Sequence, residues 1–237
     1  MIISIRQAFM SLIHMTIMEL SASIISADQL NLERDLRETQ VANVNWLHLD
    51  VMDGHFVPNL TFGIPLGQAI WKKMGMNIES HLMVDNPDRY LDRYSSFSKI
   101  ITFHYEAPVQ TSRVMKDIKG YGVKAGIAIN PGTDPSKIER MLAEVDYVLV
   151  MTVEPGFSGQ SLIESALEKI KILRDYREKQ DLHYEIGVDG GVNRNNITKV
   201  ASLRPDYIIS ASAIYNGNIK ENINFLKGAI RAVSNGQ

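Results

Sequence analysis

The stretch Trp46–Asn59, WLHLDVMDGHFVPN, combines the pattern of a β-strand with polar side chains. Its first seven residues have the composition of a β-strand, in which side chains two positions apart point to the same side. Two leucines and a valine therefore form one apolar face, while His48, Asp50 and Met52 share the other. The apolar face is sufficient to explain burial against a core, so the histidine and the aspartate on the opposite face need a second explanation.

Seven other apolar runs of similar length are separated by longer segments, the clearest of which, Leu162–Lys179, has apolar residues at helical spacing. The expected strands are Glu19–Ile25, Asn45–Met52, Asn77–Val84, Lys99–His104, Val123–Ile129, Tyr147–Val153, Tyr184–Gly190 and Asp206–Ser212. Strands that alternate with helices indicate βαβ units and a parallel sheet. Eight units predict an α/β fold of the (β/α)8 TIM barrel type in a single domain, with a doubly wound open sheet as the alternative.

The composition narrows the class of protein. The 237 residues are 45% hydrophobic and 22% charged, which is typical of a globular chain. A net charge of -2 provides no basic field for nucleic acid. The absence of cysteine excludes disulfides and fits a cytoplasmic protein. Because no apolar run reaches the roughly 20 residues of a membrane span, we expect no membrane partner.

The first residues need separate treatment. Residues 1–18 are apolar with a weak charged start, and a small-residue run follows, so they faintly resemble a signal peptide. Cleavage there would remove the first expected strand. We therefore expect residues 1–18 to be an N-terminal extension, with Met15 or Met18 as a possible true start, and residues 19–237 to form the barrel.

Polar side chains gather at the ends of the expected strands, where TIM barrels place their active sites. His48, Asp50, His81 and Asp189 end three different strands. Imidazole and carboxylate ligands suit one divalent ion, with zinc as the first choice and iron, manganese or cobalt as alternatives. Taken singly, each residue is more simply explained as a hydrogen-bonded strand end, and it is their joint position that favours a metal site.

The other histidines are assigned differently. His104 ends the fourth expected strand, and we expect it to lie beside the metal ligands or to be structural. His14, His55 and His183 lie outside the constellation and receive no role.

Glycine-rich segments follow the last three expected strands. They are Gly156–Gly159, Gly190–Gly191 and the small pair Ala211–Ser212. Loops after the seventh and eighth strands of this fold commonly bind phosphate, and backbone N–H groups would have to do so here because the loops lack lysine and arginine. The alternative is that these glycines only permit tight turns.

A metal beside a phosphate site predicts a small phosphorylated substrate. Metal coordination would polarise a carbonyl and stabilise an enediolate. Two carboxylates on different strands, Asp50 and Asp189, could then remove a proton from one face of a carbon and return one to the other. Such a reaction inverts the carbon centre.

Six segments carry a resemblance to a known family. They read LHLDVMDGHFVPNLTFG (47–63), SHLMVDNPDRYL (80–91), ITFHYEA (101–107), GIAINPGT (126–133), VLVMTVEPGFSGQSLI (148–163) and IGVDGGVN (186–193). They closely resemble ribulose-phosphate 3-epimerases, from about Leu20 to near the C-terminus. The resemblance implies a (β/α)8 barrel that interconverts ribulose 5-phosphate and xylulose 5-phosphate, and a homo-oligomer, either a dimer or a hexamer.

The resemblance also implies roles for particular residues. The metal ligands would be His48, Asp50, His81 and Asp189, and the two aspartates would be the acid/base pair. Ser23 and His81 would contact the substrate, and Met52, Met83 and Met151 would line its site. The implied phosphate-binding residues are Gly156, Phe157, Ser158, Gly159, Gly190, Gly191, Ala211 and Ser212.

Three positions depart from the family pattern. Ser158 and Ala211 replace glycines, which would cost roughly 1 kcal/mol or more if either position required a positive φ. Gly187 replaces a glutamate that is common in the family. These departures keep open an epimerase for a six-carbon ketose phosphate such as allulose 6-phosphate. A non-catalytic sugar-phosphate-binding barrel and a decarboxylase or aldolase are further alternatives.

Overall fold

A computed structural model describes residues 18–236, and these form a closed barrel of eight parallel strands in the order β1-β2-β3-β4-β5-β6-β7-β8. The strands are β1 Glu19–Ser23, β2 Trp46–Met52, β3 Asn77–Met83, β4 Ile100–His104, β5 Lys124–Ile129, β6 Tyr147–Met151, β7 Glu185–Asp189 and β8 Tyr207–Ser210. Residues of β1 pair with β8, from Glu19↔Tyr207 to Ala22↔Ser210, and this pairing closes the cylinder. The predicted TIM barrel is confirmed, and the open-sheet alternative is wrong.

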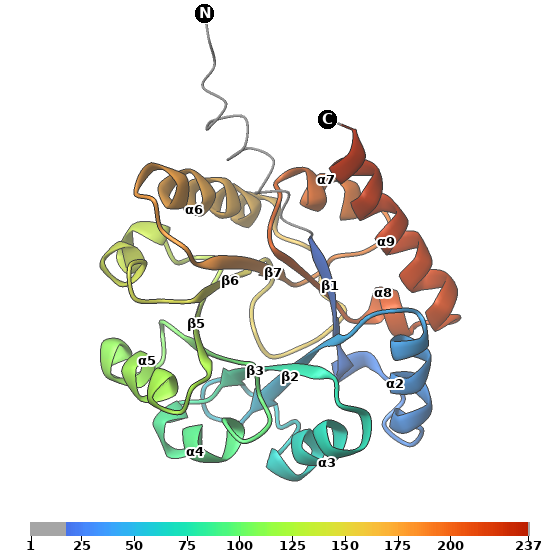
Figure 1. Cartoon of the computed structure of the whole chain (residues 1–237), viewed down its shortest axis with the longest axis horizontal. Helices are drawn as coiled ribbons and strands as arrows, with labels where there is room; N and C mark the ends of the chain where they lie inside the picture. The colour runs from blue at the N-terminus through green and yellow to red at the C-terminus, as the bar shows by residue number, and fades with distance from the viewer. Residues whose placement is uncertain (1–17, 237) are drawn as a thin grey trace, which may run out of the picture.

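Helices surround the strands, as the view down the barrel in Figure 1 shows. The α-helices are α2 Leu32–Val41, α3 Ile64–Met74, α4 Leu91–Tyr94, α5 Thr111–Gly120, α6 Glu168–Lys179, α7 Ile197–Ser202, α8 Ser212–Tyr215 and α9 Ile219–Asn235. The 3-10 helices are η1 Ile24–Ser26, η2 Pro87–Arg89, η3 Pro135–Met141 and η4 Glu164–Leu167. The C-terminal helix α9 packs against both α2 and α7, which completes the outer ring.

The helices differ from the expected pattern mainly at their ends. The segment Leu162–Lys179 contains η4 followed by α6, so its first turns are tighter than the periodicity alone predicts. The connection between β5 and β6 contains only η3. Asn218 caps α9 by accepting a hydrogen bond from the Glu221 N–H at 3.1 Å, as its residue type favours.

The predictions for residues 1–17 lie outside the described residues. Met18 is described, is buried and packs in the apolar core, although it was assigned to the extension. Within residues 18–236, no helix combines the length and apolar character that crossing a bilayer requires.

The two faces of β2 meet two different environments. Leu47, Leu49 and Val51 belong to a large apolar core between the barrel and its helices. His48 and Asp50, on the opposite face, are also buried, but they point into the barrel. A parallel barrel is covered by helices outside and filled by side chains inside, so both faces of every strand are buried. This arrangement explains why a polar pair lies opposite an apolar face.

Aromatic rings fill the barrel interior below the polar side chains. Tyr147 of β6 meets Tyr207 of β8 edge-on at a centroid distance of 5.6 Å, and Tyr207 meets Trp46 of β2 edge-on at 5.1 Å. Glycines on neighbouring strands make room for Tyr147. A Cβ at Gly187 would lie 1.9 Å from the Tyr147 hydroxyl oxygen, and one at Gly126 would lie 3.0 Å from a ring carbon.

We expect Gly187→Ala to destabilise the barrel, because its methyl group would overlap Tyr147 in a filled interior. Overpacking of this kind typically costs about 1–3 kcal/mol of unfolding free energy. The matched control is Gly228→Ala in α9, where an added Cβ meets nothing within 4 Å. That change should stabilise the protein by about 0.5–1 kcal/mol, because glycine weakens a helix interior. Urea unfolding of the three proteins measures both effects, and equal stability of Gly187→Ala and the parent protein would contradict the packing argument.

Candidate active site

Four polar side chains from β2, β3 and β7 converge inside the barrel. His48, Asp50, His81 and Asp189 each offer one ligand atom, and these atoms all lie within 4.8 Å of one another. The His48 Nε2 atom is 3.1 Å from both Asp50 Oδ1 and His81 Nδ1, and 3.6 Å from Asp189 Oδ2. Both histidines are fully buried. The cluster predicted from sequence is therefore assembled in the structure.

The donor set and its spacing fit a divalent cation. Zinc bonds to nitrogen and oxygen of about 2.0–2.2 Å place tetrahedral ligands about 3.4 Å apart. The three separations from His48 Nε2, of 3.1 to 3.6 Å, bracket that value, and no two ligand atoms are more than 4.8 Å apart. Two imidazoles and two carboxylates also suit zinc, iron, manganese or cobalt. The residues present can thus hold one such ion.

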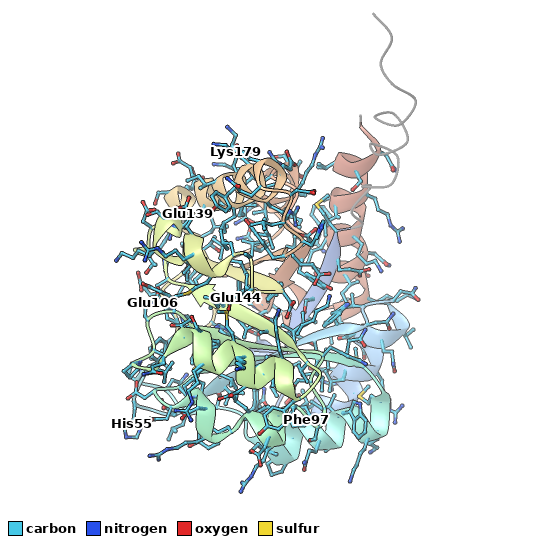
Figure 2. All side chains as sticks on the ribbon, turned by 60° about the vertical axis from the view of Figure 1, so that its left-hand side comes forward. His55, Phe97, Glu106, Glu139, Glu144 and Lys179 are labelled. Carbon is cyan, nitrogen blue, oxygen red and sulfur yellow. The ribbon has the colours of Figure 1, made fainter. Side chains whose placement is uncertain are left out.

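Two further side chains, His104 and Glu106, orient His81 on the side that faces away from the cluster. His81 Nε2 lies 2.8 Å from His104 Nε2, and the two rings stack at 4.9 Å. His104 Nδ1 in turn lies 3.3 Å from a carboxylate oxygen of Glu106. Figure 2 shows Glu106 and His55, from the loops after β4 and β2, along the same side of the molecule.

The charges of these side chains set the direction of their hydrogen bonds. Burial lowers the pKa of His104 to about 4. Burial alone would raise the pKa of Glu106, but hydrogen bonds from His104 and Thr133 outweigh it and lower that pKa to about 2. At neutral pH a neutral His104 donates from Nδ1 to the Glu106 carboxylate and accepts from His81 Nε2–H. His81 Nδ1 is left without a proton and faces the cluster.

The two aspartates have opposite protonation tendencies. Burial would raise the pKa of Asp50, but the charge and the hydrogen bond of the neighbouring His48 outweigh it and lower that pKa below its usual range. Burial raises the pKa of Asp189 to about 7, against the opposing effect of His48. The nearby Asp50 carboxylate adds to this rise. A pair of carboxylates with different pKa values is typical of an acid/base pair. A bound cation would favour the ionised form of both.

A cavity of about 200 Å³ opens over Asp50 and Asp189. Side chains of the strands form its floor, among them Ser23 and the predicted methionines Met52, Met83 and Met151. The Ser23 hydroxyl donates to Asp50 Oδ2 at 2.6 Å. The residues predicted to bind phosphate all line this cavity: Gly156, Phe157, Ser158, Gly159, Gly190, Gly191, Ala211 and Ser212. His48 and His81 do not line it, because they lie beneath Asp50 and are fully buried.

Glycine is required at two points of the cavity wall. Gly190 and Gly191 have φ of 121° and 67°, and a Cβ on either would lie within 2.9 Å of neighbouring backbone atoms. Ser158 and Ala211, where the family pattern has glycine, are not strained in this way. Ala211 has φ of -113°, and Ser158 is not among the described residues with positive φ. The cost of roughly 1 kcal/mol or more that a positive φ would bring therefore does not apply to either residue.

Several buried polar residues near the cluster were missed by the sequence reasoning. Glu79 of β3 is 2% exposed and lies 2.9 Å from His48 Nδ1 through Oε2. Glu79 stands two residues before His81 on the same face, so the alternation of β3 could have identified it. Tyr147 and Thr102, which also contact Glu79, show no sequence signal that separates them from core residues.

Comparison with known proteins identifies relatives along most of the chain. The model of the ribulose-phosphate 3 epimerase family matches residues 19–215. A ribulose-phosphate 3-epimerase of Treponema pallidum is 41% identical over 202 residues, which are 85% of this chain and 93% of that protein. One of Bacillus subtilis is 37% identical over 216 residues, which are 89% of this chain and 99% of that protein.

Solved structures that resemble the chain support the fold. A 3-hexulose-6-phosphate synthase from Salmonella typhimurium matches with a TM-score of 0.66 at 18% identity, covering 91% of this chain and all of that one. A tryptophan synthase from Mycobacterium tuberculosis matches with a TM-score of 0.67 at 13% identity, covering 95% and 97%. At these identities the likeness extends to the barrel architecture alone.

We expect the metal-stripped protein to bind one equivalent of Co²⁺, because four ligand atoms converge on one point. His48→Asn should weaken this affinity by more than the roughly 10- to 100-fold that loss of an outer hydrogen-bond partner causes. His183→Ala, at an exposed histidine outside the cluster, is the control and should bind Co²⁺ like the parent protein. Titration followed by cobalt absorption measures the affinity, and equal affinities in the two variants would argue against this site.

Proposed function

Because the chain belongs to the ribulose-phosphate 3-epimerase family, we propose that it interconverts D-ribulose 5-phosphate and D-xylulose 5-phosphate by inverting C3. One feature of the site supports this proposal most directly. Two carboxylates from different strands, the buried Asp50 and the half-buried Asp189, border one cavity whose wall is built from glycine-rich loops. A cavity of about 200 Å³ suits a small sugar phosphate.

The acid/base roles belong to Asp50 and Asp189 in this proposal. One carboxylate removes the proton at C3, and the other delivers a proton to the opposite face of the resulting enediolate. The opposite shifts in their pKa values support the assignment, because one group favours the ionised and the other the protonated state. The Ser23 hydroxyl holds Asp50 in place through Oδ2 and stands beside the substrate.

One divalent ion completes the proposed site, with zinc as the first choice and iron, manganese or cobalt as alternatives. His48, His81 and the two aspartates would hold it. When bound, it would polarise the substrate carbonyl and stabilise the negative charge that develops on the substrate oxygens.

The phosphate group is assigned to the loops after β6, β7 and β8. Gly190 and Gly191 allow the backbone to approach a ligand closely, because no side chain intervenes. Phe157 is 55% exposed at the cavity, and we place it over the bound substrate, where it would exclude water. The homo-oligomeric state and the cytoplasmic location stay predictions from the sequence.

Incubation with ribulose 5-phosphate in deuterated water should yield xylulose 5-phosphate that carries deuterium at C3, because the returned proton comes from a solvent-exchanged carboxyl group. Nuclear magnetic resonance identifies both the product and the labelled carbon. A parallel incubation with allulose 6-phosphate compares the two ketose phosphates. Faster turnover of the six-carbon compound would replace the proposed substrate. The absence of turnover with either would favour a non-catalytic sugar-phosphate-binding barrel.

Asp189→Asn should lower kcat by about 10²- to 10⁴-fold, the usual contribution of general acid–base catalysis. The asparagine keeps the size and an oxygen ligand but cannot exchange a proton with C3. Asp175→Asn, at an exposed aspartate of α6, is the matched control and should leave kcat unchanged. Both variants are measured at matched metal content. A kcat of Asp189→Asn within twofold of the control would refute the role assigned to Asp189.

A further inference from the structure

Glu79 lies outside the set of ligand atoms, yet it is the buried acid closest to His48. Its Oε2 atom is 2.9 Å from His48 Nδ1, and its Oε1 atom accepts a hydrogen bond from the Thr102 hydroxyl at 2.8 Å. The His48 nitrogen in contact with Glu79 is the one that faces away from the cluster, since Nε2 faces Asp50 and His81. Glu79 therefore touches the cluster only through the back of one imidazole.

Tyr147 reaches Glu79 from β6, across the interior of the barrel. Its hydroxyl donates to Glu79 Oε2 at 3.4 Å, and the whole residue is buried. The hydroxyl occupies the space directly beside Gly187, where a Cβ would lie 1.9 Å from it. Edge-on packing against Tyr207 holds the ring from below. The contact thus depends on the absence of a side chain at position 187.

We propose that Glu79 and Tyr147 form a positioning pair that keeps a proton on His48 Nδ1 and so reserves Nε2 for the metal ion. This inference rests on the metal centre of the proposed function. A carboxylate cannot donate a hydrogen bond, so contact with Glu79 requires the proton on Nδ1. The Tyr147 and Thr102 hydroxyls donate to the same carboxylate and hold it in place.

The arrangement complements the two side chains that orient His81. There, Glu106 acts through His104 and leaves His81 Nδ1 without a proton. Here, Glu79 acts on His48 directly. Each imidazole is backed by one carboxylate, and each directs its other nitrogen to the same point. The negative charge of Glu79 also makes His48 a more basic ligand.

Metal affinity tests the positioning role. Glu79→Gln keeps the shape and one acceptor oxygen but removes the charge, and it should weaken Co²⁺ binding about 10- to 100-fold. Tyr147→Phe should weaken binding by a smaller factor, because it removes a long hydrogen bond and leaves the carboxylate. Glu185→Gln is the matched control, since Glu185 lies at the start of β7 and pairs with Lys124 rather than with His48. It should bind Co²⁺ like the parent protein.

A spectroscopic measurement separates positioning from a merely structural effect. In the zinc-loaded parent protein, ¹⁵N-labelled histidine should show a downfield, slowly exchanging Nδ1–H proton, assigned to His48 by its loss in His48→Asn. Glu79→Ala should lose this slow exchange, because the proton no longer has its acceptor. If Glu79→Ala fails to fold, the Glu79→Gln affinity decides the question.

The possible outcomes distinguish this inference from the proposed function. A Glu79→Gln affinity within twofold of the parent value overturns the positioning role, whatever the turnover. Weakened binding in Glu79→Gln, together with a parent protein that binds Co²⁺ but leaves ribulose 5-phosphate unchanged, supports the positioning role and overturns the function. A parent protein that binds no Co²⁺ overturns the inference, since His48 would then have no metal to bind.

Discussion

Mutual repulsion among the atoms at the centre of the barrel is the constraint on which the site depends. Two imidazole nitrogens and two carboxylate oxygens lie within 4.8 Å of one another, and three of the four residues that carry them are buried. Their lone pairs repel unless protons or a cation lie between them, and burial strengthens that repulsion. Covalent attachment to β2, β3 and β7 keeps the groups together. The fold therefore supplies the energy that concentrates them, and a divalent cation offsets their repulsion.

The same constraint explains why so many polar residues lie behind the cluster. A buried imidazole that presents one bare nitrogen must place its proton on the other and find an acceptor there. Glu79 and Glu106 are the buried or half-buried acids that meet this need, directly for His48 and through His104 for His81. Tyr147 then contacts Glu79 because Gly187 leaves the necessary space. In the closed barrel, the lack of a side chain at Gly187 of β7 allows the ring of Tyr147 from β6 to reach Glu79 of β3.

Backbone conformation limits which residues the glycine-rich side of the cavity accepts. Gly190 and Gly191 adopt positive φ and pack closely on backbone, so these positions exclude a side chain. Ser158 and Ala211 are tolerated in the same cavity wall because neither adopts such a conformation. The two side chains that replace expected glycines thus fall where the backbone permits them. The strands set the polar cluster, and the loops set the shape of the cavity above it.

The architecture and the membership of the cluster could both be predicted from the amino-acid sequence. Each expected strand contains an observed one, because period-two alternation and strand-to-helix spacing are local properties of the chain. We selected His48, Asp50, His81 and Asp189 because they were expected at strand ends, which parallel strands bring to one side. In the structure β2 continues to Met52 and β3 to Met83, so both histidines lie within their strands. The separations of 3.1 to 3.6 Å between His48 Nε2 and the other three ligand atoms came only from the tertiary structure. So did the contacts of Glu79 with His48 and Tyr147, and the burial of His81 beneath Asp50. These features join residues on strands remote in sequence, and they depend on how closure of the barrel orients each strand toward those across from it.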